Sequence, residues 1–281
     1  MEPYSLNING RIVDFAVPHV MGILNLTPDS FYAASRQQTD DEILRRTEQI
    51  CVEGGTMIDV GAYSSRPGAD EVPEEEEMRR LRHGLKLVRQ VAPDAVLSVD
   101  TFRADVARMC VEDFGVGIIN DISGGSLDGR MFQTVARLGV PYVLMHMRGT
   151  PRTMQQQTSY DNLMVDMMVY FSQRVRQLRE LGQKDIIIDP GFGFAKTLDQ
   201  NYELLAHVDL LRQLGLPILI GVSRKRMVYQ LLGTTPEESL NGTTVLHTLC
   251  LSKGCADIIR VHDVGACVEA VKICRKMSLE S

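Results

Sequence analysis

Eight short apolar runs, each followed by a polar turn and a helical pattern, limit what this chain can fold into more than any other feature of its sequence. The runs are rich in Val, Ile and Leu and barely alternate with polar residues, which is typical of parallel strands buried on both faces. They lie at 20–25, 56–60, 95–100, 117–120, 141–146, 185–189, 217–221 and 256–261.

Helical patterns separate these runs. Pro73 and the four glutamates after it place acidic side chains in a first helical turn, where the helix dipole favours them. Gly139 and Gly215 follow two other patterns in a position that suits a left-handed helix stop. Helices are expected at 40–53, directly after Pro73, and at 104–114, 129–138, 160–181, 199–214, 225–232, 236–252 and 265–277.

This alternation predicts an α/β fold in which one domain, residues 1–281, forms a closed (β/α)8 TIM barrel. A short N-terminal β-hairpin is expected at 4–15, because Asn9-Gly10 stands between two apolar runs. An open doubly wound sheet is the alternative. For a dinucleotide it needs a glycine-rich GxGxxG turn after the first strand, and residues 25–29 do not supply one.

Composition narrows the class of protein further. The 281 residues carry a formal net charge of −6, which disfavours nucleic acid as a partner. No stretch approaches the apolar length of a membrane helix, and the N-terminus does not resemble a secretory signal, so we expect no membrane partner. The six cysteines form no CxxC pair, so we expect buried, reduced thiols in a cytoplasmic protein.

Polar residues stand at the ends of the predicted strands, where a barrel places its chemistry. Asp100, Asn120 and Asp189 end three of the runs and together suit the N–H edge of a planar heterocycle, although Asp100 alone would also suit a helix cap. The full set of strand-end residues is Asn25, Asp59, Asp100, Asn120, His146, Asp189, Ser223, Lys225, Arg260 and His262.

Two segments suit an anion. Hydroxyls and a guanidinium lie on the Pro- and Gly-containing loop 64–68, and three consecutive cations at 224–226 open a helix after Ser223. An ordinary surface loop and a solvated charged face are the plainer alternatives. The two histidines at strand ends match no zinc spacing, and Mg²⁺ carried in by a diphosphate and held by Asn25 is a better expectation. Met145 could wall a bound ring, whereas the methionines at 164–168 fit a helix core.

Eight short motifs run along nearly the whole chain. They are MGILNLTPDSF at 21–31, SSRPGA at 64–69, SVDT at 98–101, INDISG at 119–124, LMHM at 144–147, DPGFGF at 189–194, GVSRK at 221–225 and RVHD at 260–263. Taken together and in this order, these motifs resemble dihydropteroate synthase.

The resemblance implies that the protein is a transferase of folate biosynthesis and a target of sulfonamides. It would join 6-hydroxymethyl-7,8-dihydropterin diphosphate to 4-aminobenzoate with Mg²⁺, as a cytoplasmic homodimer. By resemblance, Lys225, Arg260, His262 and Asp100 would carry the reaction. The pterin would contact Asp100, Asn120, Asp189, Lys225, Met145, Phe194, Gly221 and Arg260. The diphosphate and metal would contact Asn25, Arg260 and His262. The aminobenzoate would contact Phe31, Ser65, Arg66, Pro67, Ser223 and Lys225.

Two loops depart from the family pattern. Ala62 and Tyr63 stand where the family commonly has Gly-Glu, and Ala33 stands where it commonly has an aspartate. Two other functions therefore stay open. A folate–corrinoid methyltransferase would keep the pterin-edge residues without the anion sites, and a silent pterin-binding paralogue would tolerate the altered loops.

Overall fold

The computed structural model describes residues 4–26, 40–63 and 71–278. Its eight-stranded sheet has the order β8-β7-β6-β5-β4-β3-β10-β9, and the paired strands run parallel. An isolated parallel bridge between Ile188 and Ile218 joins β8 to β9 and so closes the barrel. The barrel strands are β3 (His19–Asn25), β4 (Met57–Gly61), β5 (Val96–Asp100), β6 (Ile118–Asp121), β7 (Tyr142–Met145), β8 (Ile186–Asp189), β9 (Leu219–Ile220) and β10 (Ile258–Val261).

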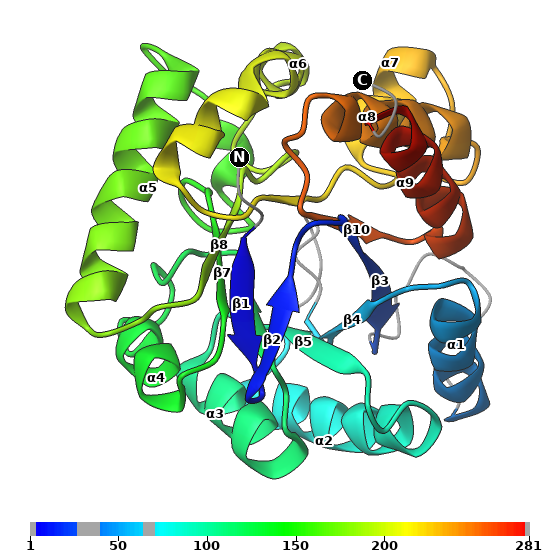
Figure 1. The fold of residues 1–281 in the computed structure, drawn as a ribbon. Helices are drawn as coiled ribbons and strands as arrows, with labels where there is room; N and C mark the ends of the chain where they lie inside the picture. The colour runs from blue at the N-terminus through cyan, green and yellow to red at the C-terminus, as the bar shows by residue number, and fades with distance from the viewer. Residues whose placement is uncertain (1–3, 27–39, 64–70, 279–281) are drawn as a thin grey trace.

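Helices surround this barrel (Figure 1). Their buried faces pack with the outward side chains of the strands into one large apolar cluster. The helices are α1 (Asp40–Val52), α2 (Glu74–Val91), α3 (Ala104–Phe114), α4 (Met131–Leu138), α5 (Leu163–Glu180), α6 (Leu198–His207), α7 (Arg226–Leu232), α8 (Leu240–Ser252) and α9 (Val264–Ser278), with 3₁₀ turns η1 (Met154–Gln156) and η2 (Val208–Leu214). The predicted α/β barrel is therefore confirmed.

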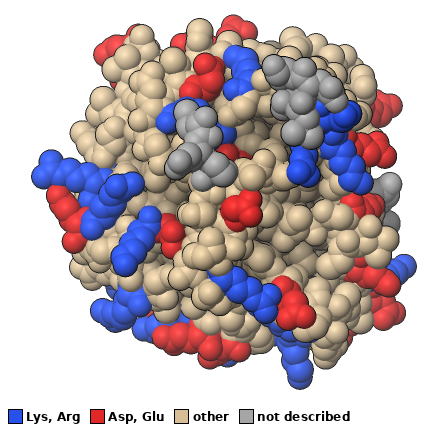
Figure 2. All heavy atoms as spheres, in the orientation of Figure 1, with Lys and Arg blue, Asp and Glu red and all other residues tan. Residues whose placement is uncertain are grey.

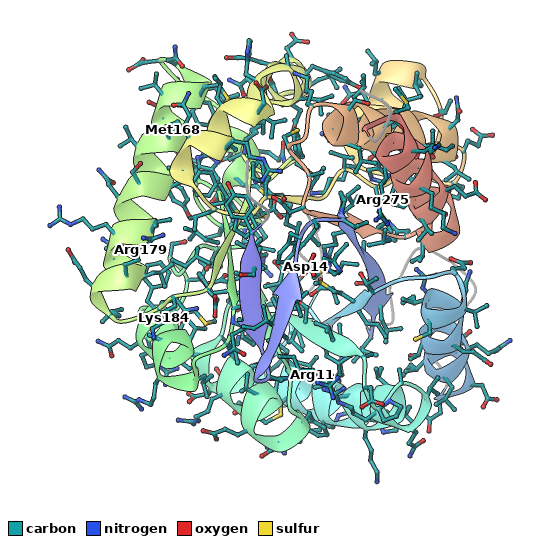
Figure 3. All side chains as sticks on the ribbon, viewed as in Figure 1. Arg11, Asp14, Met168, Arg179, Lys184 and Arg275 are labelled. Carbon is teal, nitrogen blue, oxygen red and sulfur yellow. The ribbon has the colours of Figure 1, made fainter. Side chains whose placement is uncertain are left out.

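The N-terminal hairpin is also confirmed, as β1 (Ser5–Ile8) paired antiparallel with β2 (Arg11–Asp14). Asn9 and Gly10 both have positive φ, which the tight turn between the strands requires. Its strands lie in front of the barrel in Figure 1, and Figure 3 labels Arg11 and Asp14 on β2.

The hairpin closes one end of the barrel. Its apolar side chains pack with the inward residues near the strand starts. This closed end comprises Leu6, Ile8, Phe15, Met21, Met57, Ile118, Val143, Ile187, Leu219 and Ile258.

Several helices begin or end differently from the expected ranges, for local reasons. The side chain of Asn162 accepts a hydrogen bond from Val165 N and starts α5 there, rather than at 160. The segment expected as one helix at 199–214 is α6 followed by the 3₁₀ turn η2, a common way for a helix to tighten at its end. Gly139 and Gly215 are left-handed helix caps, as expected.

The remaining composition-based expectations meet mixed outcomes. All six cysteines are free thiols, but Cys51 is exposed rather than buried. Met167 is fully buried within α5, and Met168, labelled in Figure 3, packs against the core.

Basic and acidic side chains are interspersed around the face drawn in Figure 2. Within the described ranges, no helix combines the length and apolar content needed to cross a bilayer.

Candidate active site

The C-terminal ends of the barrel strands, here called the mouth, hold a network of polar side chains that begins at Asp59. This carboxylate is fully buried and accepts from Ser98 Oγ at 2.6 Å, Asn120 Nδ2 at 3.1 Å and Arg260 Nε at 2.5 Å. A second guanidinium nitrogen of Arg260 reaches Asp100 Oδ2 at 3.2 Å. Strand alternation points these side chains inward, so residues up to about 200 positions apart in the chain meet here.

Asn120 presents an unused acceptor to the mouth. Its amide nitrogen is bound to Asp59, while its Oδ1 is buried and has no hydrogen-bond partner in the part of the chain that the structure describes. An unpaired buried acceptor costs free energy unless a ligand supplies a donor. The sequence suggested both donor and acceptor roles for this amide, but the structure leaves only the acceptor available.

Asp100 and Asp189 extend the row of acceptors. Burial raises the pKa of Asp100 to about 7, against the lowering effect of the Arg260 charge. Burial also raises the pKa of Asp189, which Lys225 opposes. One oxygen of Asp189 accepts from Gly191 N at 2.7 Å, which orients the carboxylate. Together with Asn120 Oδ1, these groups can bind a planar ligand that carries several N–H donors.

Lys225 supplies the matching donor. Its Nζ donates to Phe192 O at 2.7 Å and lies 4.9 Å from the centre of the Phe194 ring. Burial lowers the pKa of Lys225 to about 8, although the charge of Asp189 opposes this. A Cβ added to Gly221 would lie 3.7 Å from Lys225 Nζ, so glycine keeps the space beside the ammonium open.

The two arginines beside Lys225 do not face the mouth with it. Arg224 forms a two-pronged ion pair with Asp263, both contacts at 2.8 Å, and donates to Pro236 O. Arg226 is exposed and donates to Gln230 Oε1. The expectation that three consecutive cations face one anion is therefore wrong, because two of them have partners on the outside of the barrel.

His262 and Ser223 form a pair next to Arg260. Ser223 Oγ lies 3.1 Å from His262 Nδ1 and accepts from the His262 backbone N–H at 3.1 Å. Arg46 on α1 donates to His262 O at 2.5 Å and holds this segment from outside. Burial, and then the charge of Arg260, lower the pKa of His262 to about 3, so the imidazole is neutral near pH 7.

An apolar wall lines another side of the mouth. Met145 is buried and the ring of Phe194 packs partly buried beside it, as expected for residues that would contact a ring. Sulfur and aromatic groups give such a wall a soft, flat surface. Its other members are Ile122, Met147, Met154 and Ala195, with Phe102 and Leu127 partly buried against them.

Some expected residues do not join the mouth. His146 follows β7 but packs outward with the rings of Tyr170 and Phe171. The expectation that it lies with the other strand-end residues is therefore wrong. Its place in the alternation, one residue after the inward Met145, explains this. Phe31, Ser65, Arg66 and Pro67 lie outside the described residues, as does Ala33.

Tyr63, where the family commonly has glutamate, belongs to an aromatic and charged cluster. Its ring meets Phe102 edge to face at 5.0 Å, and the Arg103 guanidinium lies 5.6 Å from its centre. Arg103 also pairs with the fully buried Glu77 of α2 and donates to Val72 O at 2.7 Å. The glutamate run was expected as the acidic first turn of a helix, and the inward direction of this one carboxylate gave no distinct signal in the sequence.

The donor set does not match a resident metal centre. Within 4–26, 40–63 and 71–278, no group of three or more His, Cys, Asp or Glu side chains is arranged to hold a metal ion. Asn25 ends β3 and is paired with Gly61 of β4. A Cβ added to Gly61 would lie 3.6 Å from Asn25 Oδ1 and 3.5 Å from Asp100 Cβ, so the Asn25 amide oxygen and Asp100 are close to each other at the mouth. One amide oxygen at the mouth fits a Mg²⁺ ion that keeps most of its ligands from phosphate and water.

Two residues matter more than the sequence indicated. Asp59 was recognised only as a strand-end acid, yet it binds Ser98, Asn120 and Arg260. Lys196 was not singled out at all, although it is buried next to the mouth. Its signal was weak, because a lysine two residues after the DPGFGF motif reads as an ordinary surface residue before a helix.

Comparison with known proteins agrees with this geometry. The family described as pterin binding enzyme matches residues 21–262. Dihydropteroate synthase of Escherichia coli is 39% identical over 268 residues, which cover 94% of this chain and 93% of that protein. The Yersinia pestis enzyme, solved with a sulfonamide drug, superposes with a TM-score of 0.90 at 39% identity and covers 98% of this chain and 99% of that one. The Thermus thermophilus enzyme, solved with 4-aminobenzoate, gives a TM-score of 0.86 at 34% identity, covering 98% and 100%. By sequence and by structure, this chain belongs to the dihydropteroate synthase family of pterin-binding enzymes.

Proposed function

We propose that this chain joins 6-hydroxymethyl-7,8-dihydropterin diphosphate to 4-aminobenzoate, forming 7,8-dihydropteroate and releasing pyrophosphate. The observation that carries the proposal is the buried Asn120 Oδ1, which has no hydrogen-bond partner within the described ranges. Its strand, β6, stands in the sheet order between those that carry the carboxylates of Asp100 and Asp189. The amino group and ring N–H groups of a pterin supply the donors that such a row of acceptors needs.

The opposite side of the ring has its own partners in this arrangement. Lys225 Nζ has three donors: one is bound to Phe192 O, and the others would donate to the pterin carbonyl and ring nitrogen. Met145 and Phe194 wall the ring, and Gly221 leaves room beside it. Arg260, fixed by two carboxylates, stacks over the ring.

The diphosphate belongs beside Arg260, His262 and Ser223. Arg260 brings a positive charge whose orientation Asp59 and Asp100 determine. Mg²⁺, when bound through Asn25 and the phosphates, would neutralise negative charge on the leaving group. Neutral His262 would donate a ring N–H to a phosphate oxygen, and because the ring carries no charge, its burial has no large desolvation cost.

The displacement proceeds by departure of the diphosphate first. The electron-rich dihydropterin delocalises the resulting methylene cation, and negative charge on the side chains of Asp100 and Asp189 would help to stabilise it. The neutral arylamine then attacks the methylene carbon and loses its proton to solvent. The apolar wall around Met145 keeps water from trapping the cation. Phe31, Ser65, Arg66, Pro67 and Ser223 are proposed to shape the aminobenzoate site.

We further propose a single-domain subunit, residues 1–281, that forms a homodimer in the cytoplasm. The exposed apolar side chains on the packed pair α7 and α8 support a dimer, because a second copy would cover them. They are Leu231, Leu232, Leu240, Val245 and Leu249. Six free cysteines support a reducing compartment.

Pyrophosphate release on mixing the two substrates tests the function. We expect release only when both are present, loss of release in excess chelator and its return with Mg²⁺. A methyltransferase or a silent paralogue would bind pterin and release no pyrophosphate, and this result would overturn the proposal. Full activity in excess chelator would contradict the metal alone.

A further inference from the structure

Lys196 carries a buried amino group that has no carboxylate within ion-pair distance among the described residues, and burial lowers its pKa to about 7. It is 3% exposed, and its Nζ contacts Gly191 O at 3.0 Å, Phe194 O at 3.1 Å and His146 Nδ1 at 3.1 Å. Three donors thus meet three uncharged acceptors, and no ion pair of Lys196 occurs among the described residues. Burying a cation in this way is costly, so the position calls for a compensating role.

The acceptors show what Lys196 holds in place. Gly191 and Phe194 bracket the turn after β8, where Gly191, Gly193 and Ala195 all have positive φ. Ala195, at φ 49°, is disfavoured there because its Cβ crowds the backbone. Such a turn persists when surrounding contacts determine it, and two of those contacts come from one ammonium group.

The third acceptor ties the turn to the neighbouring strand. His146 directly follows β7, and burial together with the charge of Lys196 holds its pKa well below the usual range, so its Nδ1 accepts as a neutral ring. The backbone also packs closely here, since a Cβ added to Gly191 would lie 2.1 Å from His146 O. Lys196 therefore fixes the turn against the strand that carries Met145.

This turn holds two groups of the proposed pterin site. Phe192 O accepts from Lys225 Nζ, and the ring of Phe194 lies beneath the same ammonium. Phe192 lies between the two residues whose carbonyls Lys196 binds, and Phe194 is one of those two residues. Burial raises the pKa of Asp189, and the charge of Lys196 is one of those that oppose this rise.

We propose that Lys196 is a positioning residue for the pterin: it fixes the Gly191–Phe194 turn and thereby places Lys225 and the Phe194 ring, with its charge beside Asp189. The proposal rests on the proposed pterin site and adds to it a residue that touches no substrate. Because Lys225 is also expected to contact 4-aminobenzoate, the proposal predicts a larger effect of Lys196 on the pterin than on 4-aminobenzoate.

The first test is Lys196→Met, which keeps the length of the side chain and removes its charge and donors. We expect the KM for the pterin diphosphate to rise about tenfold or more, with a smaller fall in kcat and a 4-aminobenzoate KM within about twofold of wild type. A purely structural role would lower the active fraction and leave both KM values unchanged. That pattern, or an unchanged pterin KM, would overturn the proposal.

The matched control is Lys253→Met. The Nζ of Lys253 also binds a backbone carbonyl, Ala206 O, but on the outside of the barrel. Both KM values should match wild type in this variant. Calorimetric titration of the wild-type protein with the pterin tests the proposed function separately from the role of Lys196. If the wild-type protein binds no pterin, the proposed function itself is contradicted.

A second variant covers the case in which Lys196→Met does not fold. His146→Phe keeps an aromatic ring against Tyr170 and removes one of the three acceptors. We expect the pterin KM to rise about threefold, with the 4-aminobenzoate KM unchanged. An unchanged pterin KM in folded His146→Phe counts against the proposal.

Discussion

The two ends of the barrel interior differ sharply although the same strands build both. On β8, Ile187 packs into the closed end with the hairpin, whereas Asp189, two residues later, faces the mouth. On β6, Ile118 and Asn120 repeat the change from apolar to polar. Because side chains alternate along a strand, both members of each pair share the inward face.

This difference separates stability from function along the barrel axis. At the closed end, buried apolar side chains stabilise the fold, at about 25 cal/mol per Å² removed from water. At the mouth, burial of charged groups costs free energy, which mutual hydrogen bonds such as Arg260–Asp59 offset only in part. Mouth residues should therefore affect substrate binding, and closed-end residues should affect unfolding.

Lys225→Ala should have the largest effect at the mouth. Loss of the donor to the pterin should lower kcat/KM by about 10³-fold, or ~4 kcal/mol. The free energy of unfolding should change by less than about 1 kcal/mol, because the variant also removes a costly buried charge. Steady-state kinetics and urea unfolding measure the two quantities, and unchanged kinetics would contradict the assignment of the site.

Ile187→Ala should give the opposite result. Ile187 is fully buried at the closed end, so the truncation should lower the free energy of unfolding by about 3 kcal/mol. The KM values of the folded enzyme should stay within about twofold of wild type. A rise in pterin KM comparable to that of a mouth variant would show that the two ends are not separable.

The contrast also explains what sequence could and could not predict. The strands and the inward direction of Asp100, Asn120 and Asp189 follow from apolar runs and a period of two. The partner of Arg224, Asp263, lies 39 positions further along the chain, and the outward packing of His146 depends on α5. A local pattern describes neither contact. The buried hydrogen bonds of Asp59 are likewise a property of three dimensions.

Asp189→Asn tests a single acceptor of the mouth. The amide is nearly the same size but carries no charge, so pterin affinity should fall by about 2 kcal/mol, or roughly thirtyfold. The affinity for 4-aminobenzoate should fall much less. It is titrated after the pterin site has been filled with a pterin that lacks the diphosphate group. The reverse order in calorimetry would contradict a role at the pterin edge.

The pH dependence of pterin binding should report the charges of the mouth. With the pKa of Asp100 at about 7, protonation below that pH replaces an acceptor by a donor and weakens binding. With the pKa of Lys225 at about 8, loss of its proton weakens binding above that pH. Affinity should therefore peak between the two values and fall by about tenfold per unit on the acid side.

The measurement should use a hydroxymethyl pterin without its diphosphate. A terminal phosphate titrates near pH 6 and would overlap with the titration expected of Asp100. Asp100→Asn should flatten the acid side of the profile. An acid side that persists in this variant would assign the titration to another group.

Gly221→Ala should have the smallest effect and sharpens the comparison within the mouth. The added methyl would lie 3.7 Å from Lys225 Nζ, an ordinary contact, so the fold should tolerate it. It would occupy space that the pterin ring needs, which should weaken pterin binding by about 1 kcal/mol, or roughly fivefold. The matched substitution Gly129→Ala, where an added Cβ meets nothing within 4 Å, should leave binding unchanged. Equal pterin affinities for the two variants would mean that the ring does not approach β9, and would move the proposed ring position away from Lys225.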